Sequence, residues 1–314
     1  MASPSVRKRL PATTFNLTRR MDVKGRVFEV ALLMAVAVTL GAVAALISQV
    51  FFDAWPVLSG RFGQFLTSGL GSRPEISGIA QGLRGTLYLC FIVAVVAFPL
   101  GIGSAIYLEQ YAKPGRLTRF VDLNIRNLAG VPSVVYGILG LTVFVKGPFV
   151  GAITGGRTPL AAGLTLSALV LPLVIIASVE AIRSVPQELI EAGYGVGATQ
   201  SEVIRHHVLP YAIPGILTGT LLSMARAAGE AAPLILVGTT TGFLTNIPAW
   251  WDVGQVRERF TAMPIIITSW VRQPETGFKV EGAAAAIIVL MLVVVMLNSV
   301  AIVLRSRFEK RRQG

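Results

Sequence analysis

The feature that most constrains this chain is a set of six long apolar stretches that are almost free of charge. They cover residues 30–52, 85–108, 128–145, 158–178, 213–238 and 282–304. Each is at least as long as the ~17 residues that a helix needs to cross a ~30 Å hydrocarbon layer. The chain carries 28 Lys+Arg and 16 Asp+Glu residues, yet only Arg226 and Glu230 lie inside these stretches. The sequence therefore predicts six membrane-spanning segments.

The spanning segments are expected to be helices. In lipid, backbone polar groups must be bonded within the spanning structure, which allows helices or closed β-barrels. Continuous apolar runs favour helices, because barrel strands alternate over ~10 residues. The expected fold class is thus an all-α membrane protein with six transmembrane helices. A basic tail at 1–29 precedes the first transmembrane helix at 30–52, which is too long for a cleaved signal peptide, and a second basic tail occupies 305–314.

The distribution of basic residues predicts the orientation. With six spans both termini lie on one side, and the segments on that side hold 18 of the lysines and arginines. The three connections on the other side, 53–84, 146–157 and 239–281, hold 9. Because basic residues favour the cytoplasmic face, both termini are expected to be cytoplasmic.

Several other function classes are disfavoured by the sequence. The net charge of +12 lies in short segments beside the apolar stretches, so topology and anionic lipid explain it without nucleic acid. The chain has no Gly-x-x-x-x-Gly-Lys-[Ser/Thr] phosphate loop and no His-Glu-x-x-His pair. His206 and His207 are adjacent and point ~100° apart on a helix, so they cannot chelate a metal together. We therefore expect neither an enzyme nor a metal site.

The segment between the fourth and fifth stretches, residues 180–211, has the pattern of two short helices joined by a turn. Two pairs have the spacing of a capping box, Ser184 with Gln187 and Thr199 with Glu202. The turn is expected at Gly195–Gly197, because a glycine in a helix interior costs about 1 kcal/mol relative to alanine. The segment is thus expected to project from the bilayer as a helix-turn-helix.

Within this segment a spaced pattern runs from position 191 to position 210. The matching residues are Glu191, Ala192, Gly197, Leu209 and Pro210. They resemble the signature loop of ABC-importer permeases, which reads Glu-Ala-Ala, three residues, Gly, nine residues, Ile-x-Leu-Pro; here Gly193 replaces the second Ala and His207 replaces Ile. In that family the loop docks into a cleft of the ATPase subunit. The resemblance implies that these matching residues, with Gly193, form an ATPase-docking loop, whereas the residues alone also allow a solvated connector.

Four further stretches narrow the resemblance. They are Met224–Leu234, Val131–Gly137, Gly82–Leu87, and Ala262–Pro264 with Gln273–Pro274. All are similar to the PstA-type permeases of phosphate importers. The likeness covers about residues 76–304, including the docking loop (coupling loop) at 180–211. The resemblance implies the type I fold of ABC-importer permeases for that range.

Arg226 and Glu230 are the candidate residues of a translocation path. A charge at the centre of a span costs at least ~2.5–3.5 kcal/mol and usually faces a protein interior or a water-filled cavity. If residues 213–238 form one helix, Arg226 lies near the bilayer midplane, and Glu230 is four residues away on the same face. The guanidinium fork suits phosphate oxygens, while a purely structural Arg–Glu pair is the alternative.

The resemblance also implies the partners of an importer in the cell (plasma or inner) membrane. These are a second, PstC-like permease subunit, two PstB-like ATPase subunits and an extracytoplasmic phosphate-binding protein. ATP and Mg would bind to the partner ATPases, and this chain would bind no cofactor. Other possibilities are a permease for another oxyanion, such as sulfate or molybdate, and a self-sufficient channel or scaffold, which the docking loop argues against. Trp250, Trp251 and Trp270 in the last outer loop suit either interfacial anchoring or contact with a binding protein.

The predicted orientation can be tested by cysteine labelling in intact cells. Glu191→Cys and Lys113→Cys should react only after permeabilisation, because both lie in segments rich in basic residues. Arg61→Cys should react with an impermeant reagent from outside. Labelling of Glu191→Cys from outside would overturn the orientation.

Overall fold

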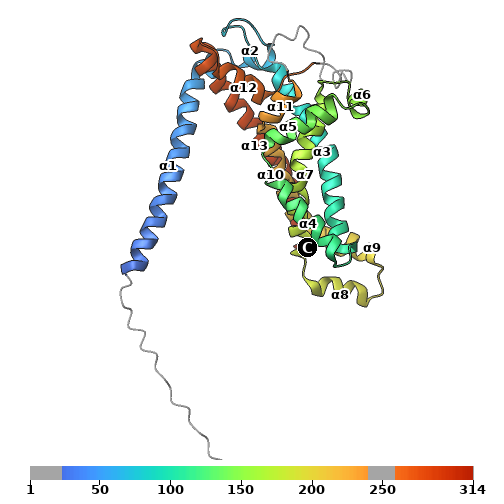
Figure 1. The fold of residues 1–314 in the computed structure, drawn as a ribbon. Coiled ribbons are helices and arrows are strands. Elements are labelled where there is room, and N and C mark those ends of the chain that lie inside the picture. The colour runs from blue at the N-terminus through green and yellow to red at the C-terminus, as the bar shows by residue number, and fades with distance from the viewer. Residues whose placement is uncertain (1–22, 240–258, 314) are drawn as a thin grey trace, which may run out of the picture. The chain divides into compact units, whose positions relative to one another are not determined.

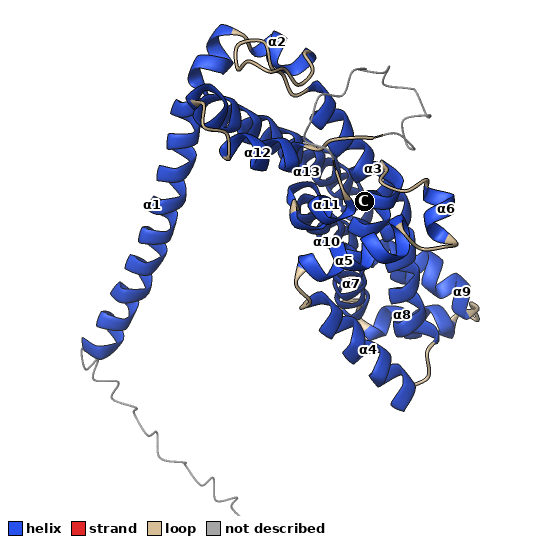
Figure 2. Cartoon of the chain, turned by 45° about the horizontal axis from the view of Figure 1, so that its top comes forward, coloured by secondary structure: helices blue, strands red, loops and turns tan. Residues whose placement is uncertain are grey.

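A computed structural model describes residues 23–239 and 259–313, and this part of the chain is almost entirely helical (Figures 1 and 2). Trp250 and Trp251 lie outside the described residues. The α-helices are α1 (Val23–Gly60), α2 (Phe62–Thr67), α3 (Ala80–Ile106), α4 (Arg116–Ala129), α5 (Ser133–Gly140), α6 (Val150–Thr154), α7 (Pro159–Arg183), α8 (Gln187–Gly195), α9 (Gln200–Val203), α10 (Leu209–Gly229), α11 (Ala232–Val237), α12 (Met263–Val271) and α13 (Ala283–Gln313). Wider π-helical turns extend several of them: η1 (Tyr107–Tyr111), η2 (Leu141–Val145), η3 (Ile204–Val208) and η5 (Gly277–Gly282).

Five helical segments in the described ranges are long and apolar enough to cross a membrane. They are Lys24–Gly60, Ala80–Tyr111, Pro159–Arg183, Gln200–Gly229 and Gly277–Ser299. The expected span at 128–145 differs, because α4 and the α5–η2 segment meet at a bend of 100°. Gly130 and Pro132 lie at this bend, and proline disfavours helical backbone in the residue before it. The predicted span at 128–145 thus corresponds to the end of α4, the bend and the α5–η2 segment, and the count is six if the bent pair is one span.

The packing of α3 on α7 shows that this bent pair must cross the bundle. Close contacts join Ile92 to Gly163 and Gly101 to Val174, so the residue numbers of the two helices rise in the same direction. Parallel neighbours require the chain to return from the end of α3 to the start of α7. The α4, α5 and η2 segments supply that return. By contrast, α10 runs antiparallel to α7, with Gly215 against Ala181 and Gly219 against Ala177.

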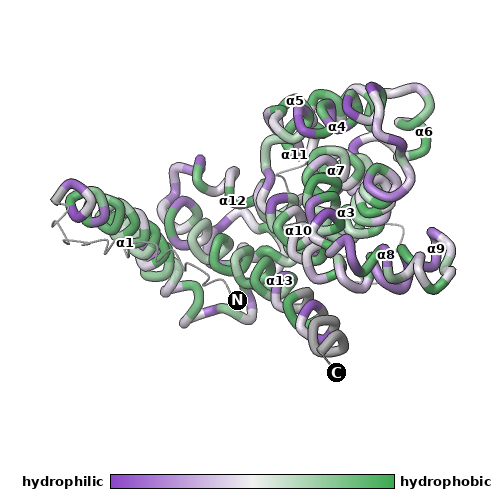
Figure 3. Tube along the Cα trace, turned by 90° about the horizontal axis from the view of Figure 1, so that it is seen from below, coloured by the Kyte–Doolittle hydropathy of each residue, from purple (hydrophilic) through white to green (hydrophobic). Residues whose placement is uncertain are grey.

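The centre of the bundle is a tightly packed core of small and branched side chains. It joins α3, α7 and α10 with the shorter α5 and α11. In α7, Ala161, Val170 and Val174 have no exposed surface. Helix α1, taken by itself, is apolar from Val30 to Ile47, which suits a helix that crosses a membrane (Figure 3).

A second core closes the bundle where α3 begins. Trp270 of α12 is only 5% exposed and packs on Phe65, with ring centroids 6.1 Å apart, and on Phe278 at 5.5 Å. The prediction that Trp270 anchors at an interface or contacts a binding protein was therefore wrong: its indole fills a core that the linear sequence does not reveal. Nearby, Arg61 donates to the carbonyl oxygens of Glu75 at 2.7 Å and Ser77 at 3.1 Å, and partial burial lowers its pKa from the ordinary value.

The fifth predicted span, 213–238, is also interrupted. Helix α10 ends at Gly229, Glu230 has extended backbone with ψ 117°, and α11 begins at Ala232. Pro233 explains the break, because in a continuous helix its ring would clash with the carbonyl of residue 229, four positions earlier. Arg226 therefore lies in the last turn of α10, at the end of a 30-residue helical segment, and not at the centre of a helix covering 213–238.

Candidate docking loop and translocation path

The 180–211 segment forms a helix-turn-helix at one end of the bundle, as expected, with α8 and α9 at the end opposite α2 and α12 (Figure 1). Of the two predicted capping boxes, the second is present: the Thr199 N–H donates to Glu202 Oε2 at 2.8 Å, and the Thr199 hydroxyl donates to the same oxygen at 2.7 Å. The first is wrong. The Ser184 hydroxyl donates to the Ala181 carbonyl at 2.8 Å and so closes the end of α7, while Pro186 precedes α8.

The turn between α8 and α9 depends on two glycines with different roles. Gly197 has φ +84°, a left-handed conformation that side chains with a Cβ rarely adopt, although open space surrounds it. Gly193 is helical and buried, and a Cβ there would lie 3.0 Å from Val203 and 3.2 Å from His207. Gly193 and His207 are the two positions at which the chain departs from the family's loop pattern. The structure brings them together, so the smaller residue makes room for the histidine ring.

The tip of this loop presents more than the matched residues. Glu191, Ala192 and Gly197 are exposed, and between them the structure also exposes Tyr194 and Val196, the latter to 83%. Sequence reasoning missed these two side chains. The sequence feature that could have revealed them is the alternation of these two large side chains with three glycines at 193, 195 and 197. These two side chains add an exposed aromatic and an exposed aliphatic group to the surface of the loop.

Ion pairs hold the base of the loop to neighbouring helices, which the sequence did not predict. Arg183 at the end of α7 pairs with Glu109 of η1 at 2.8 Å and with Glu180 at 3.6 Å. Arg126 of α4 pairs with Glu180 at 3.4 Å and with Asp122 at 3.1 Å. Each surface pair contributes little alone, but the shared Glu180 links η1, α4 and α7 into one network. The base of the loop is therefore joined by ion pairs to α4 and η1.

The candidate path pair is intact and partly open. Arg226 Nε lies 3.3 Å from Glu230 Oε1, and the side chains are 43% and 20% exposed. In the described part of the chain the two terminal nitrogens of Arg226 have no hydrogen-bond partner, so the guanidinium fork is available. Its neighbours Ala227 and Ala228 are buried in the core of the same chain. Within residues 23–239 and 259–313 the pair is therefore left partly open.

The four stretches that carried the finer resemblance meet in two pairs. The start of α3 packs on α12: the Met263 N–H donates to the Thr86 hydroxyl at 2.9 Å, and a Cβ at Gly82 would clash with Ile266. Helix α5 packs on α11, and a Cβ at Gly137 would lie only 2.8 Å from Pro233 Cα. The second contact places α5 directly beside the helix break that follows Arg226. These stretches thus form the framework around the candidate path.

Residues 97–314 match the family described as "Binding-protein-dependent transport system inner membrane component". The chain belongs to this family. It is a multi-pass membrane permease subunit, a class of transporter component that is not itself the enzyme of the system.

Curated relatives are similar over most of their length. The chain is 34% identical over 273 residues to "Phosphate transport system permease protein PstA 1" of Mycobacterium tuberculosis, which covers 85% of this chain and 84% of the relative. It is 32% identical over 291 residues to "Phosphate transport system permease protein PstC" of Mesorhizobium japonicum, which covers 83% of this chain and 85% of the relative.

Solved structures show the same fold. A bacterial alginate ABC transporter chain superimposes with TM-score 0.63 at 14% identity, covering 88% of this chain and 93% of that chain. A chain of the methionine transporter MetNI gives TM-score 0.52 at 18% identity, covering 74% and 94%. The predicted fold of an ABC-importer permease is therefore confirmed.

The contact between Gly193 and His207 predicts a coupled pair. Gly193→Ala gains about 1 kcal/mol of helix propensity but overpacks the α8–α9 contact, which typically costs about 1–3 kcal/mol. We expect a net loss of up to about 2 kcal/mol, measured as a lower melting temperature of the purified protein. His207→Ala combined with Gly193→Ala should recover part of that loss. Equal melting temperatures for Gly193→Ala and the original protein would show that the contact does not constrain position 193.

Proposed function

We propose that this chain is one of two permease subunits of an ATP-driven phosphate importer. Its similarity to the phosphate permeases PstA 1 and PstC supports the substrate and the pairing, because both kinds of relative match over more than four fifths of this chain. The second permease would be PstC-like. A phosphate-binding protein on the outer side would deliver the anion, since one arginine beside one carboxylate is too weak for tight capture.

The observation that carries the proposal is the half-exposed Arg226 at the break between α10 and α11. Only its Nε is used by Glu230, so the terminal nitrogens can bind two oxygens of a phosphate in the bidentate manner that guanidinium favours. Glu230 balances the positive charge of Arg226 when no anion is present. The electrostatic repulsion between Glu230 and a passing phosphate keeps the interaction transient, as conduction through a path requires.

ATP hydrolysis would come from partner subunits that dock on the 180–211 loop. Tyr194 and Val196 would enter an apolar groove of the ATPase, and the exposed Glu191 would contact its polar rim. Closure of the ATPase dimer would then move the loop, and the ion pairs of Glu180 and Arg183 would transmit that movement to α4 and η1. ATP and Mg would stay on the ATPases, and this chain would hold no cofactor.

The path can be tested with Arg226→Gln. Losing a charge-assisted hydrogen bond is worth about 1.5–3 kcal/mol, so phosphate uptake should fall about 10- to 100-fold while the complex still assembles. Arg226→Lys should retain only part of the phosphate uptake, because lysine keeps the positive charge but lacks the guanidinium fork. Lys146→Gln, which removes an exposed charge elsewhere, is the matched control. Radiolabelled phosphate uptake and complex abundance are measured on the same membranes, with sulfate and molybdate as competing oxyanions.

The double variant Arg226→Gln with Glu230→Gln separates a path from a scaffold. Removing one partner of a structural buried pair leaves an uncompensated charge, costing about 3–5 kcal/mol, which the double replacement relieves. A scaffold therefore predicts recovered assembly together with recovered uptake. A path predicts intact assembly in both variants with uptake still low in the double variant, and full transport by the double variant would rule out the path assignment.

Docking can be tested with two matched pairs of variants. Gly197→Val should impair ATPase association because it forces a branched residue to φ +84°, whereas Gly195→Val, also in open space but at ordinary φ, should be milder. Glu191→Lys should weaken association more than Glu188→Lys, which makes the same charge change on the same helix. The measurement is co-purification of the ATPase with the permease. Unchanged association for Gly197→Val and Glu191→Lys would refute docking through this loop.

A further inference from the structure

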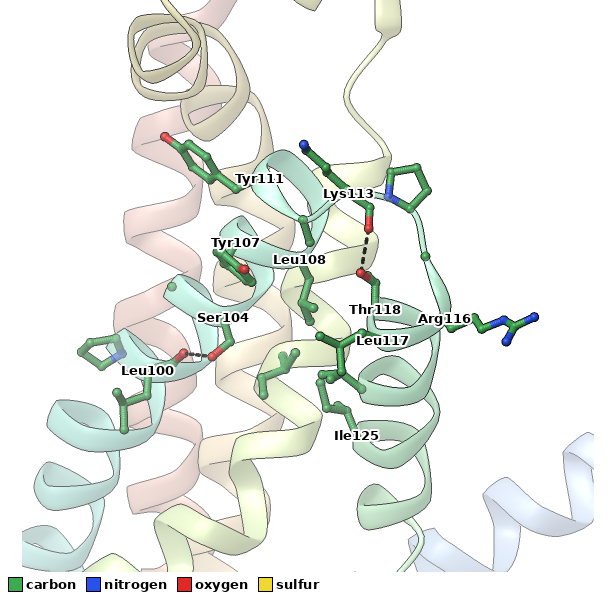
Figure 4. Close-up of a pocket in the computed structure, with 17 residues that line it drawn as sticks. Leu100, Ser104, Tyr107, Leu108, Tyr111, Lys113, Arg116, Leu117, Thr118 and Ile125 are labelled. Atoms are coloured by element: carbon green, nitrogen blue, oxygen red, sulfur yellow. Dashed lines mark hydrogen bonds between the residues drawn. The ribbon is translucent and has the colours of Figure 1, made fainter.

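A cavity of about 960 Å³ lies between the end of α3 with η1 and the first turns of α4, with Ile175 of α7 also lining it (Figure 4). Its volume is within the ~300–1,000 Å³ typical of pockets that bind small molecules. The cavity is distinct from the Arg226 region and from the tip of the docking loop. Nothing in the proposed transport cycle uses it.

The walls of this cavity are mostly aliphatic. Leu100 on α3 and Leu117 on α4 are 57% and 76% exposed, and Leu108 and Ile125 lie between the two helices (Figure 4). Leu100 lies on a helix that is long and apolar enough to cross a membrane, so we expect its exposed side chain to face the hydrocarbon region, while Leu117 lies in the first turn of α4 near the polar end of the slot. The cavity is therefore an apolar slot that is open to the membrane along its side.

The other end of the slot is polar and positively charged. Tyr107, Tyr111, Lys113 and Arg116 line it, and Figure 4 shows the Lys113 side chain reaching toward Tyr111 while Arg116 projects outward. Neither cation has an ion pair in the described part of the chain. The nearby carboxylates are already engaged, because Glu109 pairs with Arg183 and Asp122 with Arg126.

The start of α4 adds further donors at this end. Its N-cap residue is Gly115, which provides no side-chain cap, so the first-turn N–H groups of α4 have no capping acceptor. Arg116, Leu117 and Thr118 of that first turn line the cavity. A helix N-terminus favours phosphate through its free N–H groups and its dipole. Lys113, Arg116, the first turn of α4 and two tyrosines therefore line one end of an apolar slot, with the Arg116 guanidinium turned outward.

We propose that this slot binds an anionic phospholipid, with its phosphate between Lys113, Arg116 and the start of α4 and an acyl chain along Leu100 and Leu117. Basic pockets between transmembrane helices on the cytoplasmic side are typical binding sites of anionic headgroups. Tyrosines commonly mark the level of the headgroups. The proposal uses the orientation predicted from the basic residues, and it is independent of which ion is transported.

Bound lipid would also contact the network at the base of the docking loop. Tyr107 and Tyr111 belong to the same π-helical turn as Glu109, which pairs with Arg183. Asp122 and Arg126 lie on α4, on the opposite side of the slot. An occupant that spans α3 and α4 would therefore hold both partners of the network in place, and anionic lipid would stabilise the loop base.

The headgroup site can be tested on the assembled complex, purified in detergent, by native mass spectrometry with added phosphatidylglycerol or phosphatidylcholine. Each basic residue near a membrane surface contributes about five-fold to the affinity for anionic lipid. Lys113→Gln with Arg116→Gln should therefore weaken phosphatidylglycerol binding about 25-fold and leave the weaker phosphatidylcholine binding unchanged. Arg119→Gln with Arg307→Gln removes two exposed charges outside the slot and is the control. Equal losses in both double variants would overturn the headgroup assignment.

The acyl-chain site is tested by filling the slot. Gly103 lines the cavity, and a Cβ there would meet nothing within 4 Å, so Gly103→Leu should occlude the slot without disturbing the core. Gly41→Leu in α1, also in open space, is the matched control. We expect Gly103→Leu to reduce binding of phosphatidylglycerol at least ten-fold. Unchanged lipid binding in Gly103→Leu would contradict the proposal.

A photoreactive amino acid at Leu117 then identifies the occupant directly. Cross-linking to lipid in native membranes supports the proposal, whereas cross-linking to the second permease would overturn it by showing that a protein fills the slot. These measurements need no transport. A complex that binds lipid at this slot but takes up another anion would disprove the proposed substrate and keep the lipid site. A complex that takes up phosphate but binds no lipid at this slot would disprove the lipid site and keep the proposed substrate.

Discussion

The parallel packing of α3 on α7 is the constraint on which the rest of the bundle depends. Because α3 and α7 run in the same direction, the end of α3 and the start of α7 lie at opposite ends of the bundle. Residues 107–158 must therefore cross back between them. They do so as a bent pair and not as one helix, because Gly130 and Pro132 interrupt it. The bend leaves α4 packed on α7 and across the slot from the end of α3, and it brings α5 to α11. The slot and the framework around the path are both consequences of this return.

The break between α10 and α11 shows how one proline can place a charged residue. Pro233 ends α10 at Gly229, which leaves Arg226 in the last turn, where a cation also interacts favourably with the helix dipole. The buried Ala227 and Ala228, which follow Arg226, pack this turn against the core of the same chain, while the Arg226 side chain stays 43% exposed. A half-exposed arginine compensated by one carboxylate suits a path completed by a second subunit.

The docking loop illustrates compensation between two residues. Glycine at 193 and histidine at 207 each depart from the family's pattern, and taken separately each would weaken the loop. In the fold they touch, and the missing methyl group leaves space for the imidazole ring. The loop thus keeps its helix-turn-helix geometry, while the ion pairs of Glu180 and Arg183 connect its base to α4 and η1.

The sequence by itself determined the fold class, the helix-turn-helix at 180–211, the Thr199–Glu202 capping box and the turn at Gly197. These follow from hydropathy and local backbone chemistry, which act over a few residues. Only the tertiary structure decided the burial of Trp270, the proximity of Gly193 to His207 and the shared ion pairs of Glu180. Each joins residues from different helices, and such contacts depend on how helices pack against one another, which no local pattern records.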